Sequence, residues 1–485
     1  MDGMSPSQSL DQLAADYWEG VLQRDPTLAT FFGDYRLNDR LPDAGPDGRA
    51  AQRRALEDVQ RGLAIIPAEG LSAQERITWD MLRLTAEMGL AALPLRLDEM
   101  AVDQMNGPQV WLPELLNWHP TDTAEHVEQL IARYHAFPRY IDQYLDNLRD
   151  GQRDGRLATA MARERVAAQL RALLARPATD SPLAEPAKRF PELSEPLIES
   201  IESAVAPAIG VEEFQHPMVS GREHPGVWSV TDGEQIYALL CRQHTTTDLT
   251  PQQLHDVGLD ELRSTQAEMR AIMERLGDGS GDIRTFTERL TTEPSNLSSS
   301  REEIVAAANQ LLASAQGALP RAFGRLPKIP CEVKAIEDYR EKDAVAAFYY
   351  PPSGDGARGG IFYVNTYDPS SRPKHTLPAL TFHEAVPGHH LQIALSTENR
   401  DLPAFRRLGS DVTAYVEGWA LYTERLSEEL GLYPDDYARF GMLGYQAWRA
   451  CRLVVDTGMH YLRWSRQQGI DFFLSNVGLT ERETV

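Results

Sequence analysis

Apolar residues recur every three or four positions along most of the chain, which is the period of an amphipathic α-helix. The pattern predicts helical regions at about 10–150, 156–175, 195–205, 251–276, 301–312, 376 onward, 411–430 and 437–466. The region at 251 has a clear start, because Thr250 can cap it, Pro251 suits the first helical position and Gln253 completes a capping box. The predicted fold class is therefore mainly α.

Alternation typical of strands is limited to one part of the sequence. It predicts short strands at about 332–336, 346–350 and 361–364, which would form a small β-sheet. Gly360, just before the last of them, leaves room for another backbone to approach. We therefore consider Gly360 a candidate substrate-binding residue on an edge strand. A small hairpin that packs on helices is an equally good interpretation.

The length of 485 residues allows one large domain or two lobes. The segment 177–191 contains four prolines and predicts a loop, which is a candidate boundary between lobes. We expect a mainly helical N-terminal part at 1–210 and a second part at 211–485 that contains the candidate metal site.

The composition is that of an ordinary globular protein, with 42% hydrophobic and 25% charged residues. A net charge of −23 argues against nucleic acid or an anionic membrane as a partner. No apolar run approaches the roughly 20 residues that span a bilayer, and the N-terminus lacks a signal-peptide pattern. Three widely separated cysteines favour a reducing compartment, so we expect a cytoplasmic location. The sequence leaves the oligomeric state open.

The strongest chemical signal is the stretch His383-Glu384-Ala385-Val386-Pro387-Gly388-His389-His390. Zinc peptidases use His-Glu-x-x-His, in which the two histidines face one metal ion from one side of a helix. Here the later histidines come six and seven residues on, where an ideal helix points the first about 120° away and carries the second about 10 Å along the axis.

Pro387 and Gly388 can break the helix and restore the geometry. If two residues loop out, His389 takes the second ligand position, and if three loop out, His390 does. We favour His389, because the smaller bulge disturbs the helix less. The alternative is a broken helix with histidines on its surface.

A glutamate on the next predicted helix is the candidate third ligand. Glu417 lies among apolar residues, and a buried carboxylate must be paired or bound to a metal. It shares one helix face with Thr413, Leu421 and Glu424. A buried salt bridge is the alternative interpretation.

The last long helix has a polar stripe. Its members recur at three- and four-residue spacing: Tyr445, Arg449, Arg452, Asp456, His460 and Arg463. Such a stripe is typical of a solvated face. It is also what a cleft wall uses to bind a carboxylate and to stabilise an oxyanion.

These stretches resemble the eight-eight-five family of bacterial domains of unknown function, which is placed among zincin-like metallopeptidases. The matching segments are 383–392, 415–424, 450–460, 359–366 and 244–259. More distantly, Gly388-His389 is similar to the end of the zinc motif in relatives of thimet oligopeptidase and angiotensin-converting enzyme. That resemblance implies a mainly helical fold with a deep cleft beside the small sheet, and Glu417 as third zinc ligand.

We therefore expect a zinc-dependent hydrolase that cleaves peptide or other amide bonds. His383, His389 and Glu417 would hold one zinc ion, which activates a water molecule, and Glu384 would act as general base. Tyr445 or His460 would stabilise the oxyanion. Arg449 or Arg452 would hold a substrate carboxylate and favour carboxypeptidase- or dipeptidase-like action. The alternatives are a hydrolase of a non-peptide amide or ester, a non-catalytic binding protein and a purely structural helical protein.

The end of the sequence carries one more expectation. Thr480 and Glu483 form the pattern of a capping box that opens a helix, and the sequence stops at Val485. Members of the family usually continue with a further segment, so we expect a truncated protein.

Overall fold

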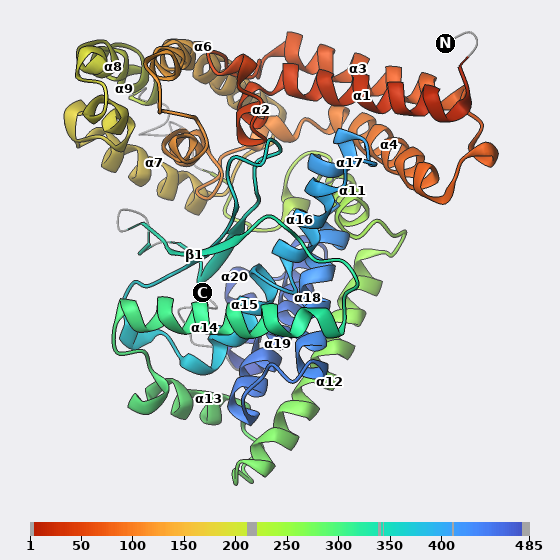
Figure 1. Ribbon diagram of the computed structural model, residues 1–485, viewed down its shortest axis with the longest axis vertical. Helices are drawn as coiled ribbons and strands as arrows, with labels where there is room; N and C mark the ends of the chain where they lie inside the picture. Colours follow the sequence, from red (N-terminus) through yellow and green to blue (C-terminus); the bar gives the residue numbers. More distant parts are fainter. Residues whose placement is uncertain (1–3, 211–220, 338–340, 343, 410–411, 478–485) are drawn as a thin grey trace. The chain divides into compact units, whose positions relative to one another are not determined.

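The computed structural model describes residues 4–210, 221–337, 341–342, 344–409 and 412–477 (Figure 1). It is mainly helical with one small sheet, which confirms the fold class at this level. The expected capping box at Thr480 lies outside the described residues. None of the helices in the described ranges combines the length and apolar character needed to cross a bilayer.

The chain divides into two compact units, residues 1–239 with 403–409 and residues 240–402 with 410–485. The division therefore falls between Leu239 and Leu240, later in the chain than the expected boundary at 210/211. Every candidate site residue named from the sequence belongs to the second unit.

The first unit is built from helices that pack their apolar faces together. Its described α-helices are α1 (Pro6–Arg24), α2 (Pro26–Phe31), α3 (Pro46–Ala64), α4 (Ala73–Ala92), α5 (Pro108–Glu114), α6 (Ala124–Asp154), α7 (Ala160–Leu174), α8 (Ser194–Ser200), α9 (Ala206–Ile209) and α17 (Ala404–Leu408). Helix α11 (Gly233–Thr245) crosses from this unit into the second.

The second unit combines helices with the sheet. Its elements are α12 (Pro251–Arg275), α13 (Ile283–Thr292), α14 (Arg301–Ala318), β1 (Cys331–Ala335), β2 (Ala347–Tyr350), β3 (Gly360–Val364), α15 (Leu377–Glu384), α16 (His389–Glu398), α18 (Thr413–Glu429), α19 (Asp436–His460) and α20 (Arg466–Asn476). Helix α12 begins with the predicted capping box of Thr250 and Gln253. The three predicted strands are confirmed within one residue at each end.

The strand order in the sheet is β1-β3-β2. Strand β3 is parallel to β1 and antiparallel to β2, with Gly360 opposite Cys331 and Phe362 opposite Tyr349. All five residues of β3 are buried. The sheet packs through Phe362 and Val364 against a core to which α14, α15 and α16 also contribute.

Helices α12 and α19 lie side by side and carry much of the other core of this unit (Figure 1). Their backbones approach closely at Gly258 of α12. A Cβ atom at this position would lie 2.8 Å from a methyl group of Val454 and 3.1 Å from the carbonyl oxygen of Ala450. Glycine is therefore required here by packing and not by backbone conformation.

Substituting two helical glycines should change stability in opposite directions. Gly258→Ala overpacks the α12–α19 contact, which costs about 1–3 kcal/mol and outweighs a gain of about 1 kcal/mol in helix propensity. Gly317→Ala in α14 gains the same propensity with no neighbouring atom within 4 Å. Thermal unfolding monitored by circular dichroism should show a lower midpoint for the first variant and an equal or higher midpoint for the second. Equal shifts of the same sign would contradict this account.

Candidate metal centre

The two histidines of the motif lie on two separate helices. Helix α15 ends at Glu384, and α16 begins at His389. The expected two-residue bulge inside one helix is therefore wrong, since four residues that include a cis Val386–Pro387 peptide separate the helices. A Cβ atom on Gly388 would collide with the carbonyl group of His383. Glycine thus allows the second helix to start directly against the end of the first.

This break brings His383, His389 and Glu417 together. The His383 Nε2 atom lies 3.5 Å from one oxygen of Glu417, and the His389 Nε2 atom lies 3.7 Å from the other. One ligand atom from each residue lies within 4.8 Å of the others. The imidazole rings are almost perpendicular, at 85°, with centroids 4.8 Å apart.

These separations fit a shared metal ion better than direct hydrogen bonds. Two ligands of a tetrahedral zinc ion, each about 2.0–2.1 Å from the metal, lie about 3.3 Å from each other. Good hydrogen bonds between nitrogen and oxygen are about 2.9 Å long. Two imidazoles with one carboxylate are also a donor set that suits zinc. The residues present therefore fit a zinc ion, although their role as ligands stays a prediction.

Glu417 differs from expectation in its exposure. The sequence suggested a buried carboxylate, whereas the Glu417 side chain is 57% exposed. Its pKa is lowered to about 2, chiefly by the neighbouring His383 imidazole. The cluster is consequently open to solvent on the side of α18, and the argument from burial that first selected Glu417 was wrong.

The buried carboxylate on this helix is Glu424, two turns further along. Its side chain is 1% exposed, and Oε1 lies 2.8 Å from His383 Nδ1. A carboxylate on the outer nitrogen of a metal-binding histidine fixes the orientation of the ring. The sequence placed Glu424 on the same helix face as Glu417, and this seven-residue spacing was the signal that could have identified it.

Arg449 of α19 supports Glu424. Its Nη2 atom lies 2.8 Å from Glu424 Oε1 and 3.1 Å from His383 Nδ1. The Nη2 atom of this guanidinium is paired inside the protein, and the expected role of Arg449 in holding a substrate carboxylate stays a prediction.

His383 is flanked by two carboxylates. Burial acts to lower the pKa of the imidazole, but Glu417 and Glu424 outweigh burial and raise it to about 9. The pKa of His389 is instead lowered to about 4, because burial and the nearby charge of His383 both disfavour a second imidazolium. Protonation in this pair is therefore concentrated on His383.

His390 points away from the cluster. Its Nδ1 atom lies 2.8 Å from the Tyr349 hydroxyl, and its Nε2 atom lies 3.0 Å from the carbonyl oxygen of Ile329. Burial lowers the pKa of this imidazole to about 4. The structure therefore brings His389, and not His390, beside His383.

The contact between His390 and the Tyr349 hydroxyl also explains why position 360 is a glycine. A Cβ atom here would collide with the Tyr349 hydroxyl and would lie 2.5 Å from His390 Nδ1. Strand β3 is the middle strand, so Gly360 is not on a sheet edge. Its expected role in binding substrate by strand addition is wrong, because β1 and β2 occupy both sides of β3.

Glu384 follows His383 at the end of α15. It retains some solvent access, yet it is packed closely enough that burial raises the pKa of its carboxyl to about 7. His383 opposes this rise, and the negative charge of Glu417 adds to it. A carboxyl group that titrates near neutral pH can both accept and return a proton, which is the property a general base requires.

The other candidate residues of the predicted stripe on α19 have different surroundings. Tyr445 is buried in the core, with the Arg449 guanidinium 5.9 Å from its ring centre. Arg452 is exposed and lies over the Trp448 ring at 4.8 Å, so its expected role in substrate binding is not supported. His460 follows Arg449 by eleven residues, or about 16 Å along the helix, and its expected role in oxyanion stabilisation stays a prediction.

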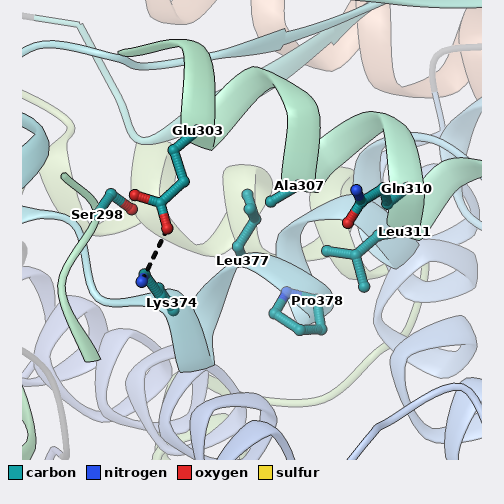
Figure 2. A pocket seen from close by; sticks show the side chains of 8 residues that line it. All are labelled: Ser298, Glu303, Ala307, Gln310, Leu311, Lys374, Leu377 and Pro378. Atoms are coloured by element: carbon teal, nitrogen blue, oxygen red, sulfur yellow. Dashed lines mark ion pairs between the residues drawn. The ribbon is translucent and has the colours of Figure 1, made fainter. Parts of the chain in front are cut away.

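A cavity of about 290 Å³ lies between α14 and the start of α15. Figure 2 shows Glu303 and Lys374 on its wall, joined by an ion pair of 2.8 Å, with Leu377 and Pro378 nearby. His383 is at the opposite end of α15, so this cavity is not the deep cleft expected beside the metal-binding residues.

Comparisons with known proteins agree on family and fold. The sequence profile described as "Bacterial protein of unknown function (DUF885)" matches residues 26–485. The structure is similar to that of a candidate lipoprotein from Colwellia psychrerythraea, at 25% identity and a TM-score of 0.91, over 99% of this chain and 88% of the other. A candidate lipoprotein of unknown function from Shewanella oneidensis gives 17% identity and a TM-score of 0.69, over 98% and 88%. The second likeness shows the fold alone. No curated protein matches the chain.

Glu424→Gln should weaken zinc binding by about 10- to 100-fold, because the carboxylate that orients His383 is lost. Competition with a coloured chelator measures the affinity. Glu429→Gln, an exposed change on the same helix, is the matched control and should bind zinc like the unaltered chain. Unchanged affinity in the Glu424 variant would show that this carboxylate does not support the site.

Zinc binding should release at least one proton at about pH 7.5, since His383 with a pKa near 9 is protonated in the metal-free protein. Apparent affinity should rise with pH up to about 9, because fewer protons then compete for His383. Calorimetric titration in two buffers of different ionisation enthalpy measures the release. Identical heats in both buffers would contradict it.

Proposed function

The chain belongs to the DUF885 family of bacterial proteins, and we propose that it is a zinc-dependent hydrolase that cleaves peptide or other amide bonds. The observation that carries this proposal is the spacing of the candidate ligand atoms. The Nε2 atoms of His383 and His389 lie 3.5 and 3.7 Å from the two carboxylate oxygens of Glu417. That spacing is too long for strong hydrogen bonds and close to that of ligands around one zinc ion.

His383, His389 and Glu417 would hold the metal. When bound, zinc supplies a Lewis acid that activates water and polarises a carbonyl group. The exposure of Glu417 leaves a side of the cluster through which a substrate could enter. Glu424 and Arg449 hold the His383 ring in place, so its Nε2 atom stays directed at the other two ligands.

Glu384 would move the proton. It lies next to His383 in the chain, and the pKa of its carboxyl is about 7. Near neutral pH a substantial fraction is ionised and can take a proton from water. The protonated form can then give this proton to the leaving nitrogen of the amide.

The substrate class remains broad in this proposal. A carboxypeptidase- or dipeptidase-like preference depended on Arg449 and Arg452, of which one is paired with Glu424 and the other lies over Trp448. We therefore propose a peptide or small amide as substrate without a terminal carboxylate requirement. The cytoplasmic location stays a prediction. The two similar structures are described as candidate lipoproteins.

Glu384→Gln tests the proposal. The amide keeps the shape of the side chain but cannot take a proton, so turnover should fall by roughly two orders of magnitude or more. Zinc content should stay the same, whereas His383→Ala should lose the metal. Cleavage of a peptide mixture followed by mass spectrometry, together with elemental analysis, gives both readouts.

The exposed Glu429→Gln change is the control for loss of a carboxylate and should retain both zinc and turnover. Full turnover by the Glu384 variant would exclude this residue as the base. Absence of zinc from the unaltered chain after reconstitution would exclude the metal centre itself.

A further inference from the structure

One exposed histidine outside the proposed metal centre contacts the helix that carries Glu417. His244, at the end of α11, has its Nδ1 atom 3.0 Å from the Thr413 hydroxyl. Thr413 is the first residue of α18 and precedes Glu417 by four residues. Residues four apart on a helix share a face, with Cβ atoms about 5–6 Å apart. The His244 imidazole is therefore held one helical turn from Glu417.

Glu417 is also the exposed member of the cluster, with 57% of its side chain accessible. The histidine and the accessible side of the cluster consequently belong to the same end of α18. A molecule that approached the cluster past Glu417 would pass the imidazole of His244, which is itself exposed.

The turn that follows His244 is strained and firmly held. Thr246 has a φ of +55°, in the left-handed region that a β-branched residue rarely adopts. The Thr245 hydroxyl donates to the carbonyl of Cys241 at 2.8 Å and lies 2.9 Å from the Thr247 hydroxyl. The next helix begins at once, capped by Thr250. Strained residues that are fixed in this way concentrate at functional sites.

We propose that His244 is a substrate-binding residue of the metal centre and donates a hydrogen bond from Nε2 to the carbonyl oxygen of the bound amide. This inference rests on the proposed hydrolase function. When the Thr413 hydroxyl donates to Nδ1, the neutral imidazole carries its proton on Nε2 and presents a donor on its outer side. Thr413 thus fixes the position of the ring, and the donating role of His244 belongs to the tautomer that carries the proton on Nε2.

The test uses the full chain loaded with Co²⁺, whose visible spectrum reports ligands that join the metal. Acetohydroxamate, which offers a carbonyl oxygen and an oxyanion, is titrated into the unaltered protein and into His244→Gln. We expect the variant to keep one Co²⁺ per chain and to bind acetohydroxamate at least about tenfold more weakly, the effect of one lost hydrogen bond to a charged ligand.

Two further variants complete the design. Thr413→Val keeps the imidazole but removes its anchor and should weaken binding by a few-fold. His135→Gln, an exposed histidine on α6, is the matched control and should bind like the unaltered chain.

The outcomes separate the inference from the function on which it rests. If both proteins bind Co²⁺ and have equal affinity for acetohydroxamate, His244 has no role in binding, and the metal centre is unaffected. The same conclusion follows if both bind Co²⁺ and neither binds acetohydroxamate. Failure of the unaltered chain to bind Co²⁺ overturns the metal centre and the inference together.

Discussion

The candidate site depends on the contact between Gly388 and the carbonyl group of His383. A side chain at position 388 would collide with this carbonyl, so the second helix could not start where it does. Because α16 begins immediately after the break, the His389 ring meets the His383 ring at 85°. The same change of direction turns His390 toward Tyr349 and the sheet. One backbone contact therefore directs two adjacent histidines differently, so that His389 faces the cluster and His390 faces the sheet.

Helix α18 provides two carboxylates to the same histidine in different environments. Glu417 is 57% exposed and faces Nε2, whereas Glu424 is 1% exposed and faces Nδ1. The exposed carboxylate is ionised at neutral pH, because its pKa is lowered to about 2, and solvent can reach it. The buried one needs a partner, because an unpaired charge there would be expensive. The difference in burial thus divides the two glutamates into a candidate ligand and an orienting group.

Local signals made much of the second unit predictable. Thr250 and Gln253 form the capping box that the sequence indicated, and the strand at 361–364 is where alternation placed it. Proximity of His389 to His383 also followed from the local pattern, because Pro387 and Gly388 break a helix by their own chemistry.

The errors concern relations between segments distant in the chain. The pairing of β1 with β3 puts Gly360 in the middle of the sheet, and no residue near Gly360 reveals this. Apolar neighbours suggested that Glu417 was buried, but they face other sides of α18. The spacing of the stripe on α19 predicted a single polar surface. In the structure, Arg449 forms an ion pair with Glu424, whereas Arg452 is exposed. Periodicity predicts which residues share a face of a helix. Only the folded structure shows which residues of other segments contact that face.

The negative charges around His383 favour a cation at its Nε2 atom. An imidazolium with a raised pKa lies between Glu417 and Glu424, so a proton occupies the position that a metal ion would take. Arg449 contacts Glu424 as well, so this buried carboxylate keeps a cationic partner whether His383 is charged or neutral. Arg449 therefore supports Glu424, Glu424 orients His383, and His383 presents Nε2 with Glu417 and His389 already in place. Under the proposed function, a site arranged in this way would need little rearrangement for a divalent ion to replace the proton.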